Sequence, residues 1–333
     1  MRVLLWYAHG SYVNALVRGN HQYLVCAADP FGGGPPIPTS PWPESVTVVG
    51  VEELRADPPD VVVIQRLEEI DCCRSLLGFE PGRDRPAIFC EHNVPRHDIP
   101  SAAHPLADRN RWLIVHVTGV NALLWDCGRT RTKTIGHGIP DPAARYVGDL
   151  GRAAFVVNEP VRRGRVVGTD LLPIVAPRVG VDVFGIDGDR LIAARPEADL
   201  RFGGNLSQAE LWDAVAQDRV YLHLVRWTSL GLSLIEAMLM AMPVAVLAMT
   251  EAASLPPEIG VVSSDPDRLR RRVEELIDDP DGARRCGLLA REVALERFSL
   301  AAFLRNWDEA YEQAVEIFRQ RGATSMATAG RAE

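Results

Sequence analysis

Glu236 stands in an otherwise apolar and small-residue stretch, TSLGLSLIEAMLMAMPV at residues 228–244. The pattern predicts a helix that is hydrophobic on most faces and therefore buried. A buried carboxylate without partners costs several kcal/mol, so Glu236 needs hydrogen-bond donors in the folded protein. One donor could be the helix itself, because Ser233 and Glu236 have the spacing of a capping box. The alternative is a ligand with paired hydroxyl groups.

The residues just before this helix could bind an anion. The apolar run RVYLHLV predicts a buried strand, and RWTSLG then leads to the helix that carries Glu236. A helix amino terminus at the end of a parallel sheet offers unpaired N–H groups and the positive end of the helix dipole. Gly231 allows a close approach of the backbone. We therefore expect a phosphate or diphosphate at Gly231, Leu232 and Ser233.

A cationic loop and a polar strand end could complete a site. Arg162, Arg163 and Arg165 lie in NEPVRRGRVVGTDLL, an unusually basic stretch for an acidic chain. A cation about 4 Å from a phosphate supplies roughly 4 kcal/mol at an effective dielectric near 20. The alternative is a solvated basic turn. His92, in CEHNVPRHD, follows the apolar run PAIFC and is either a site residue or a structural histidine. Gly10, in YAHGSY, permits close approach after the first strand.

The elements that must position these residues alternate along the chain. Short apolar runs bounded by Gly, Pro, Asp or His predict buried parallel strands. In the first half they are RVLLWYA, QYLVCA, SVTVVG, DVVVIQR, PAIFCEH, WLIVHVT and TKTIGHG; in the second they are AAFVVNE, GVDVFG, RVYLHLV, MPVAVLA and GVVSS. Helical patterns include SQAELWDAVAQ, with a capping box at its start, and SDPDRLRRRVEELIDD. DPFGGGPPIPTSPWPES predicts a loop. The chain is therefore predicted to be an α/β protein with two doubly wound sheets.

Composition limits the class of protein. A chain of 333 residues with 47% hydrophobic residues predicts two globular domains. The net charge of −8 argues against nucleic acid or a membrane surface as a partner. No apolar run has membrane-spanning length and no signal-peptide pattern begins the chain, so we expect a cytoplasmic protein. The six cysteines contain no CxxC pair, which predicts buried free thiols and no metal site.

The run TSLGLSLIEAMLMAMPVAV resembles the signature of the retaining family-4 glycosyltransferases with the GT-B fold, the superfamily of glycogen synthase and phosphatidylinositol mannosyltransferase. That signature has two glutamates flanking seven residues, and its EAM is followed by a small residue and PVV. The segment from VVSSDPDRL to ERFSL and the stretch IGHGIPDP are also similar to the family. The resemblance covers the second half of the chain closely and the first half loosely.

The resemblance implies two Rossmann-like domains facing across a cleft. Residues 1–146 would form the acceptor-side domain and residues 147–304 the nucleotide-sugar domain. Residues 305–321 would be a helix packing back towards the first domain, followed by a frayed tail at 322–333.

The resemblance also assigns roles. Glu236 corresponds to the glutamate that binds the ribose hydroxyls, and His92 to a histidine that approaches the donor sugar. The family's first glutamate falls on Thr228. Arg162 matches the arginine that neutralises the diphosphate, whereas the lysine position is Val167.

The resemblance gives roles to three further residues. Arg163 and Arg165 could compensate for the missing lysine, and Gly10 stands where the family has a Gly-Gly loop. His92, Thr228 and Arg162 are then the catalytic candidates.

The expected function is metal-independent transfer of a sugar, with retention of configuration, to a glycan, lipid or small-molecule acceptor. The donor would be a nucleotide diphosphate sugar, with UDP or GDP favoured and no further cofactor. The leaving phosphate would accept the acceptor's proton. The alternative is a catalytically degenerate nucleotide-binding protein or partner subunit, which Thr228 and Val167 motivate. A dinucleotide-dependent oxidoreductase is disfavoured because no strand is followed by GxGxxG.

Overall fold

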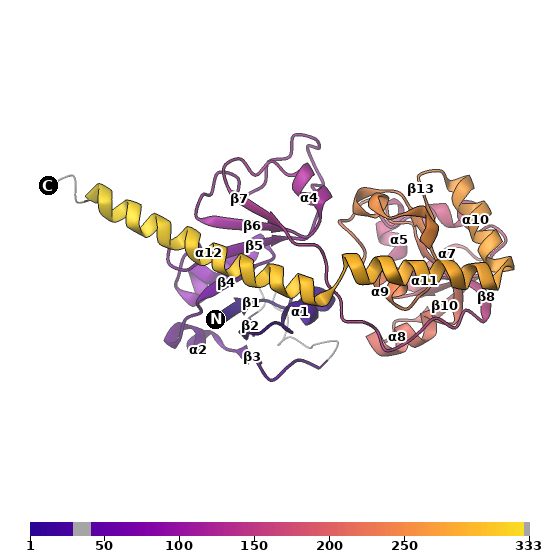
Figure 1. Cartoon of the computed structure of the whole chain (residues 1–333), viewed down its shortest axis with the longest axis horizontal. Coiled ribbons are helices and arrows are strands. Elements are labelled where there is room, and N and C mark those ends of the chain that lie inside the picture. The colour runs from indigo at the N-terminus through magenta and orange to yellow at the C-terminus, as the bar shows by residue number, and fades with distance from the viewer. Residues whose placement is uncertain (29–40, 330–333) are drawn as a thin grey trace. The chain divides into compact units, whose positions relative to one another are not determined.

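The computed structural model describes residues 1–28 and 41–329 (Figure 1). The chain divides into two compact units, one formed by residues 1–138 with 300–333 and the other by residues 139–299. Most of the predicted loop DPFGGGPPIPTSPWPES lies outside the described residues, as do residues 330–333. Each unit is an α/β domain built on one parallel sheet, which confirms the predicted fold class.

The first unit contains a seven-stranded parallel sheet in the order β3-β2-β1-β4-β5-β6-β7. The strands are β1 (Arg2–Leu5), β2 (Gln22–Cys26), β3 (Val46–Val49), β4 (Val61–Ile64), β5 (Ala87–Glu91), β6 (Trp112–His116) and β7 (Arg131–Thr134). The helices are α1 (Gly10–Leu16), α2 (Val51–Ala56), α3 (Leu67–Cys72), the π-helical η1 (Cys73–Leu77), α4 (Gly119–Leu124) and α12 (Leu300–Ala329). Central strands β4, β5 and β6 are buried along their whole length, as their continuous apolar runs predict.

The carboxyl-terminal helix α12 belongs to the first unit and packs against β4, β5 and β6. Phe303, Trp307 and Tyr311 are buried on its inner side. The indole N–H of Trp307 donates to the hydroxyl of Tyr12 at 3.1 Å. The helix continues to Ala329, through most of the segment that was expected to be frayed.

The second unit contains a six-stranded parallel sheet in the order β10-β9-β8-β11-β12-β13. The strands are β8 (Leu150–Val156), β9 (Val181–Phe184), β10 (Leu200–Gly204), β11 (Asp218–His223), β12 (Val244–Leu247) and β13 (Gly260–Ser263). The α-helices are α5 (Pro160–Arg163), α6 (Leu172–Val175), α7 (Gly188–Ala194), α8 (Gln208–Val215), α9 (Leu232–Leu239), α10 (Pro266–Asp278) and α11 (Pro280–Arg297). The 3₁₀ turns are η2 (Gly164–Val166), η3 (Thr169–Leu171), η4 (Thr250–Ser254) and η5 (Pro257–Ile259).

The predicted strands of the second half all form, but one strand was missed. β10 lies at the edge of the sheet, and its three central residues are exposed. Its sequence LRFGG has neither an apolar run nor a regular alternation, because only one neighbouring strand and little core dictate its residues. The predicted capping box of α8 is confirmed, with Ser207 at the N-cap and Glu210 bonding back to it.

Two further sequence expectations can be compared with the structure. All six cysteines are buried free thiols, as predicted. Within residues 1–28 and 41–329, none of the helices combines the length and the hydropathy needed to cross a bilayer.

Candidate functional site

Glu236 is a buried carboxylate on a buried helix. α9 begins after Gly231, and no side chain caps it, so Ser233 lies inside the first turn. The capping-box alternative for Ser233 and Glu236 is therefore wrong. Glu236 is 5% exposed and accepts a hydrogen bond from the side-chain amide of Gln208 on α8 at 2.9 Å. Burial raises the pKa of Glu236 to about 7, although Trp212 and Gln208 offset part of that rise.

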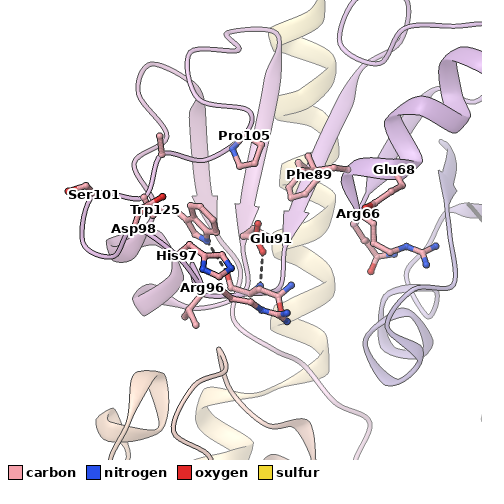
Figure 2. Close-up of a pocket in the computed structure, with 16 residues that line it drawn as sticks. Arg66, Glu68, Phe89, Glu91, Arg96, His97, Asp98, Ser101, Pro105 and Trp125 are labelled. Atoms are coloured by element: carbon pink, nitrogen blue, oxygen red, sulfur yellow. Dashed lines mark hydrogen bonds between the residues drawn. The ribbon is translucent and has the colours of Figure 1, made fainter. Parts of the chain in front are cut away.

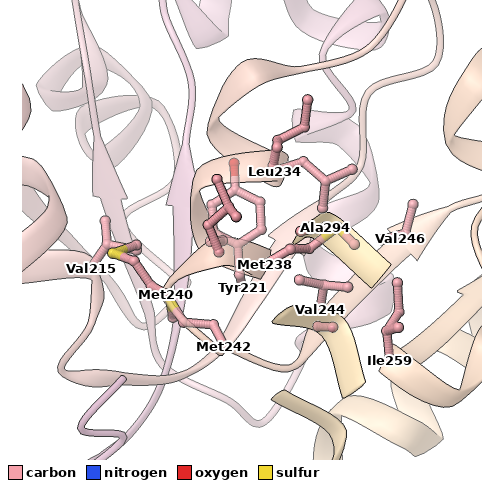
Figure 3. Packing of buried hydrophobic residues seen from close by; sticks show 14 of the residues in the cluster. Val215, Tyr221, Leu234, Met238, Met240, Met242, Val244, Val246, Ile259 and Ala294 are labelled. Carbon is pink, nitrogen blue, oxygen red and sulfur yellow. The ribbon is translucent and has the colours of Figure 1, made fainter. Parts of the chain in front are cut away.

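The surroundings of α9 explain its burial. Leu234 and Met238 belong to an apolar cluster that includes Tyr221 and Val244 from the neighbouring strands (Figure 3). Leu234 and Met238 are 0% exposed. This core fixes the helix, and the single carboxylate on it, relative to the sheet.

The first turn of α9 is held against the end of β11. The hydroxyl of Tyr221 donates to Ser233 Oγ at 2.8 Å. A Cβ on Gly231 would lie 2.6 Å from Cε1 of His223, so only glycine fits there without moving the ring. His223 is 4% exposed, and burial lowers its pKa to about 4, which keeps it neutral at pH 7. Sequence reasoning missed His223, although a histidine inside the apolar run RVYLHLV was an available signal.

Two of the three arginines of the predicted cationic loop, Arg162 and Arg165, are ion-paired on the protein. Arg162 is largely exposed and donates from Nε to Glu159 at 2.6 Å. Arg165 is exposed and pairs with Asp170 at 3.0 Å, while Arg163 is half-buried. Val167, at the position of the family's lysine, is 2% exposed and packs in the core. The loop thus presents arginines but no cation at position 167.

The arginine loop packs directly on the segment that leads into α9. Gly168 has a φ of 82°, and a Cβ there would lie 2.0 Å from the carbonyl oxygen of Leu224. Arg226 donates to both carboxylate oxygens of Asp170, at 2.6 and 2.9 Å, and its backbone N–H donates to Val166 O at 2.9 Å. Arg226 holds the pKa of Asp170 below its usual range. Sequence reasoning missed Arg226 and Asp170, which join the two loops.

Thr228 is half-buried in the same loop, between β11 and α9. It places a neutral hydroxyl where the resembling family has a carboxylate. This loop also contacts η4, because the hydroxyl of Thr250 donates to the carbonyl of Ser229 at 3.3 Å. Within the second unit, Thr228, Gly231, Leu232, Ser233 and the arginine loop therefore belong to one connected region, with Glu236 on the adjoining helix.

His92 lies just after β5 in the first unit, where it contacts two other rings. Its ring centroid is 4.0 Å from that of His9 and 4.6 Å from that of Tyr12. Burial lowers the pKa of His9 to about 4 and that of His92 well below its usual value, so both rings are neutral at pH 7. Gly10 begins α1 directly after His9. The structure thus brings the segment of Gly10 and His92 together, although β4 lies between β1 and β5 in the sheet.

The hydrogen bonds of Gln65 assign the tautomer of His92. Gln65 donates its side-chain N–H to the carbonyl of Trp6 at 2.8 Å, so its amide oxygen faces His92 Nε2 at 3.0 Å. Because that oxygen can only accept, His92 Nε2 carries the proton and Nδ1 carries the lone pair.

A pocket of about 910 Å³ opens within the first unit, with Glu91 and Asn93 but not His92 in its lining (Figure 2). Arg66 and Glu68 lie on one side of it, and Trp125, His97 and Asp98 lie on the other. The full lining is Gln65, Arg66, Leu67, Glu68, Phe89, Glu91, Asn93, Val94, Arg96, His97, Asp98, Ser101, Ala102, Ala103, Pro105 and Trp125. The mixture of aromatic, amide and charged groups suits a polar molecule with an apolar face.

Residues 161–309 match a family model described as glycosyl transferase-like. No curated protein matches the chain. Among solved structures, sucrose-phosphate synthase from Thermosynechococcus elongatus has a TM-score of 0.69 at 14% identity, covering 94% of this chain and 98% of that one. HepE from Anabaena, solved in complex with UDP, has a TM-score of 0.66 at 15% identity, covering 94% and 100%.

TarM from S. aureus, solved with fondaparinux, α-GlcNAc-glycerol and UDP, has a TM-score of 0.61 at 14% identity. The match covers 78% of this chain but only 58% of TarM. At these identities the likeness concerns the fold, and the family match covers most of the second unit and the start of α12. Taken together, residues 161–309 match the glycosyl transferase-like family model, and the two parallel-sheet domains have the GT-B fold of these solved structures.

Proposed function

We propose that the protein transfers a sugar from a nucleotide diphosphate sugar to an acceptor hydroxyl, with retention of configuration and without a metal ion. The observation that carries this proposal is Glu236, a 5%-exposed carboxylate on α9, the helix that begins at Gly231. One carboxylate oxygen accepts from Gln208, and a carboxylate has capacity for further donors. The two hydroxyls of a ribose are suitable donors, each worth about 1.5 to 3 kcal/mol when the acceptor is charged.

The diphosphate would lie near Gly231, Leu232 and Ser233. Arg165 and Arg226 share the single carboxylate of Asp170, so this trio carries one net positive charge beside the loop. The exposed Arg162, together with Arg163, could add positive charge on reorientation. UDP is the first nucleotide to test, since HepE was solved with UDP and with UDP-glucose, and GDP is the second.

The chemistry would need no protein base. The bond from the anomeric carbon to the β-phosphate oxygen breaks as the acceptor oxygen bonds to the same face, and the leaving phosphate takes the acceptor's proton. Thr228 would hydrogen-bond the sugar rather than stabilise its positive charge. The acceptor would bind to the first unit, where the pocket lined by Arg66, Glu91 and Trp125 offers polar and aromatic contacts.

Replacing Glu236 by Gln tests the ribose contact. The amide oxygen can still accept from Gln208, so the fold should persist, and the thermal midpoint should stay the same or rise because a buried charge is removed. Affinity for UDP-glucose should fall about tenfold or more. Glu292→Gln on the exposed face of α11 is the matched control and should change neither quantity. Unchanged affinity together with lower stability would show that Glu236 is purely structural.

A nucleotide-binding protein without transferase activity is the second candidate. Thr228 in the loop and the buried Val167 favour it, because both remove a charged group from the region. Slow release of UDP from UDP-sugars in the absence of an acceptor would support the enzyme. Tight nucleotide binding without turnover on any donor and acceptor would support the binding role.

The six free thiols fit a reducing compartment such as the cytoplasm, which we propose as the location of the protein.

A further inference from the structure

A small basic pocket lies along the edge strand of the second unit. It has a volume of about 230 Å³ and is lined by Pro257, Gly260, Val261, Arg268, Arg271, Arg272 and Glu275. Gly260 and Val261 begin β13, whereas Gly231 follows the carboxyl end of β11. Because all strands of this sheet are parallel, the pocket lies towards the end opposite the proposed donor loop.

One of the arginines in this pocket, Arg272, already has hydrogen-bond partners within the protein. Arg272 donates from Nε to Gly260 O at 3.3 Å, from one terminal nitrogen to Glu275 at 2.9 Å and from the other to Cys286 Sγ at 3.4 Å. The negative charge of Glu275 is therefore matched by Arg272. The remaining charge of the pocket is that of Arg268 and Arg271.

Arg268 and Arg271 differ from the other arginines on α10. Both are exposed, and neither makes a side-chain hydrogen bond or ion pair with any residue in 1–28 or 41–329. Between them, Arg270 pairs with Asp267 at 3.5 Å and with Glu274 at 3.2 Å. Two like charges spaced i, i+3 lie on the same helix face and repel each other, so an anion between them would stabilise the helix.

The chemistry of the pocket selects one class of ligand. Guanidinium groups match the oxygen geometry of a phosphoryl group and can donate in pairs. The volume is below the roughly 300 to 1,000 Å³ typical of sites for whole drug-sized ligands. We propose that Arg268 and Arg271 bind a phosphoryl group, carried either by a small phosphorylated metabolite or by a lipid headgroup. This site is separate from the nucleotide site and does not depend on the proposed transferase activity.

Calorimetric titration with inorganic phosphate tests the site. We compare the wild-type chain, the double variant Arg268→Gln/Arg271→Gln and the control Arg270→Gln, which alters a paired arginine on the same helix. Phosphate affinity should fall about tenfold or more in the double variant and change less than about twofold in the control. Both variants should keep the wild-type circular dichroism spectrum, because the altered side chains lie outside the core. Equal phosphate binding by all three proteins would place any phosphate elsewhere and overturn the proposal.

Vesicle sedimentation distinguishes the two sources of the phosphoryl group. Phosphatidylcholine vesicles with and without phosphatidic acid are incubated with the same three proteins. Binding that needs phosphatidic acid and is lost only in the double variant identifies a lipid headgroup. Phosphate binding without vesicle binding identifies a soluble phosphorylated ligand. Absence of both kinds of binding in the wild-type protein would refute the site.

Discussion

The buried carboxyl of Asp218 allows a quantitative test of how the stability of the second unit depends on pH. It begins β11 and is 0% exposed, and neither carboxylate oxygen has a hydrogen-bond partner of good geometry among the described residues. Burial, followed by the negative charge of Asp182, raises the pKa of Asp218 to about 8, while Arg152 opposes the rise. Arg152 itself is bonded to Asp182 at 2.5 Å and to Asp199 at 3.0 Å. Asp218 is therefore mainly protonated at pH 7.

The raised pKa determines how stability depends on pH. A carboxyl that binds its proton more tightly in the folded state contributes stability that is complete below the unfolded pKa of 3.8 and is lost as pH rises towards 8. Since pH 7 lies about three units above the unfolded value and each unit corresponds to about 1.4 kcal/mol, the loss between pH 4 and pH 7 is roughly 4 kcal/mol. Asp218→Asn keeps the volume and removes the titration. The variant should match the wild type near pH 4 and exceed its stability by up to that amount at pH 7.

Urea unfolding of the two proteins from pH 4 to pH 8 measures this difference directly. Taking the difference removes the titration of all other groups, including the buried histidines. Asp213→Asn, an exposed carboxylate on α8, is the control and should follow the wild type at every pH. A wild-type curve parallel to that of Asp218→Asn, or a variant that is less stable at pH 7, would refute the protonated, buried state of Asp218.

Three other predictions follow from the second unit. Because burial raises the pKa of Glu236 to about 7, wild-type affinity for UDP-glucose should rise about tenfold from pH 6 to pH 8, and Glu236→Gln should abolish that dependence in calorimetric titrations. Gly168→Ala should lower the free energy of unfolding in urea by about 2 kcal/mol or more, since its Cβ would lie 2.0 Å from Leu224 O. Gly78→Ala is its control, with a φ of 76° and open space, and should cost only about 1 kcal/mol. Because burial lowers the pKa of His223 to about 4 from 6.5, it contributes roughly 3 kcal/mol above pH 6.5 that is lost towards pH 4, and His223→Gln should flatten that part of the acid-unfolding curve.

The sequence predicts the sheets well because burial on both faces restricts their residues. β4, β5 and β12 are buried along their whole length and appear as uninterrupted apolar runs. β10 was not predicted because an exposed edge strand is under no such restriction. Burial also made Glu236 recognisable in the sequence, because a carboxylate is costly in a helix that is apolar on most faces.

The pairing of side chains across loops could not be read from the sequence. Arg226 and Asp170 are 56 positions apart and meet only because Gly168 lets one loop approach the carbonyl of Leu224. Nothing in the local pattern of either loop indicates the other. The tautomer of His92 could not be predicted from the sequence either, because it depends on the orientation of the Gln65 amide, which the carbonyl of Trp6 fixes.

The position of positive charge near α9 follows from these contacts. Val167 is part of the apolar core, so a lysine there would have to bury its charge or displace the loop. Arg226 enters the same region from the facing loop and is 22% exposed, held by Asp170 and by the carbonyl of Arg165. Because Asp170 neutralises one of the two guanidinium groups it contacts, the trio of Arg165, Asp170 and Arg226 carries one net positive charge. Arg226 thus supplies a cation in this region although position 167 does not, and this is the charge that the proposed diphosphate site would use.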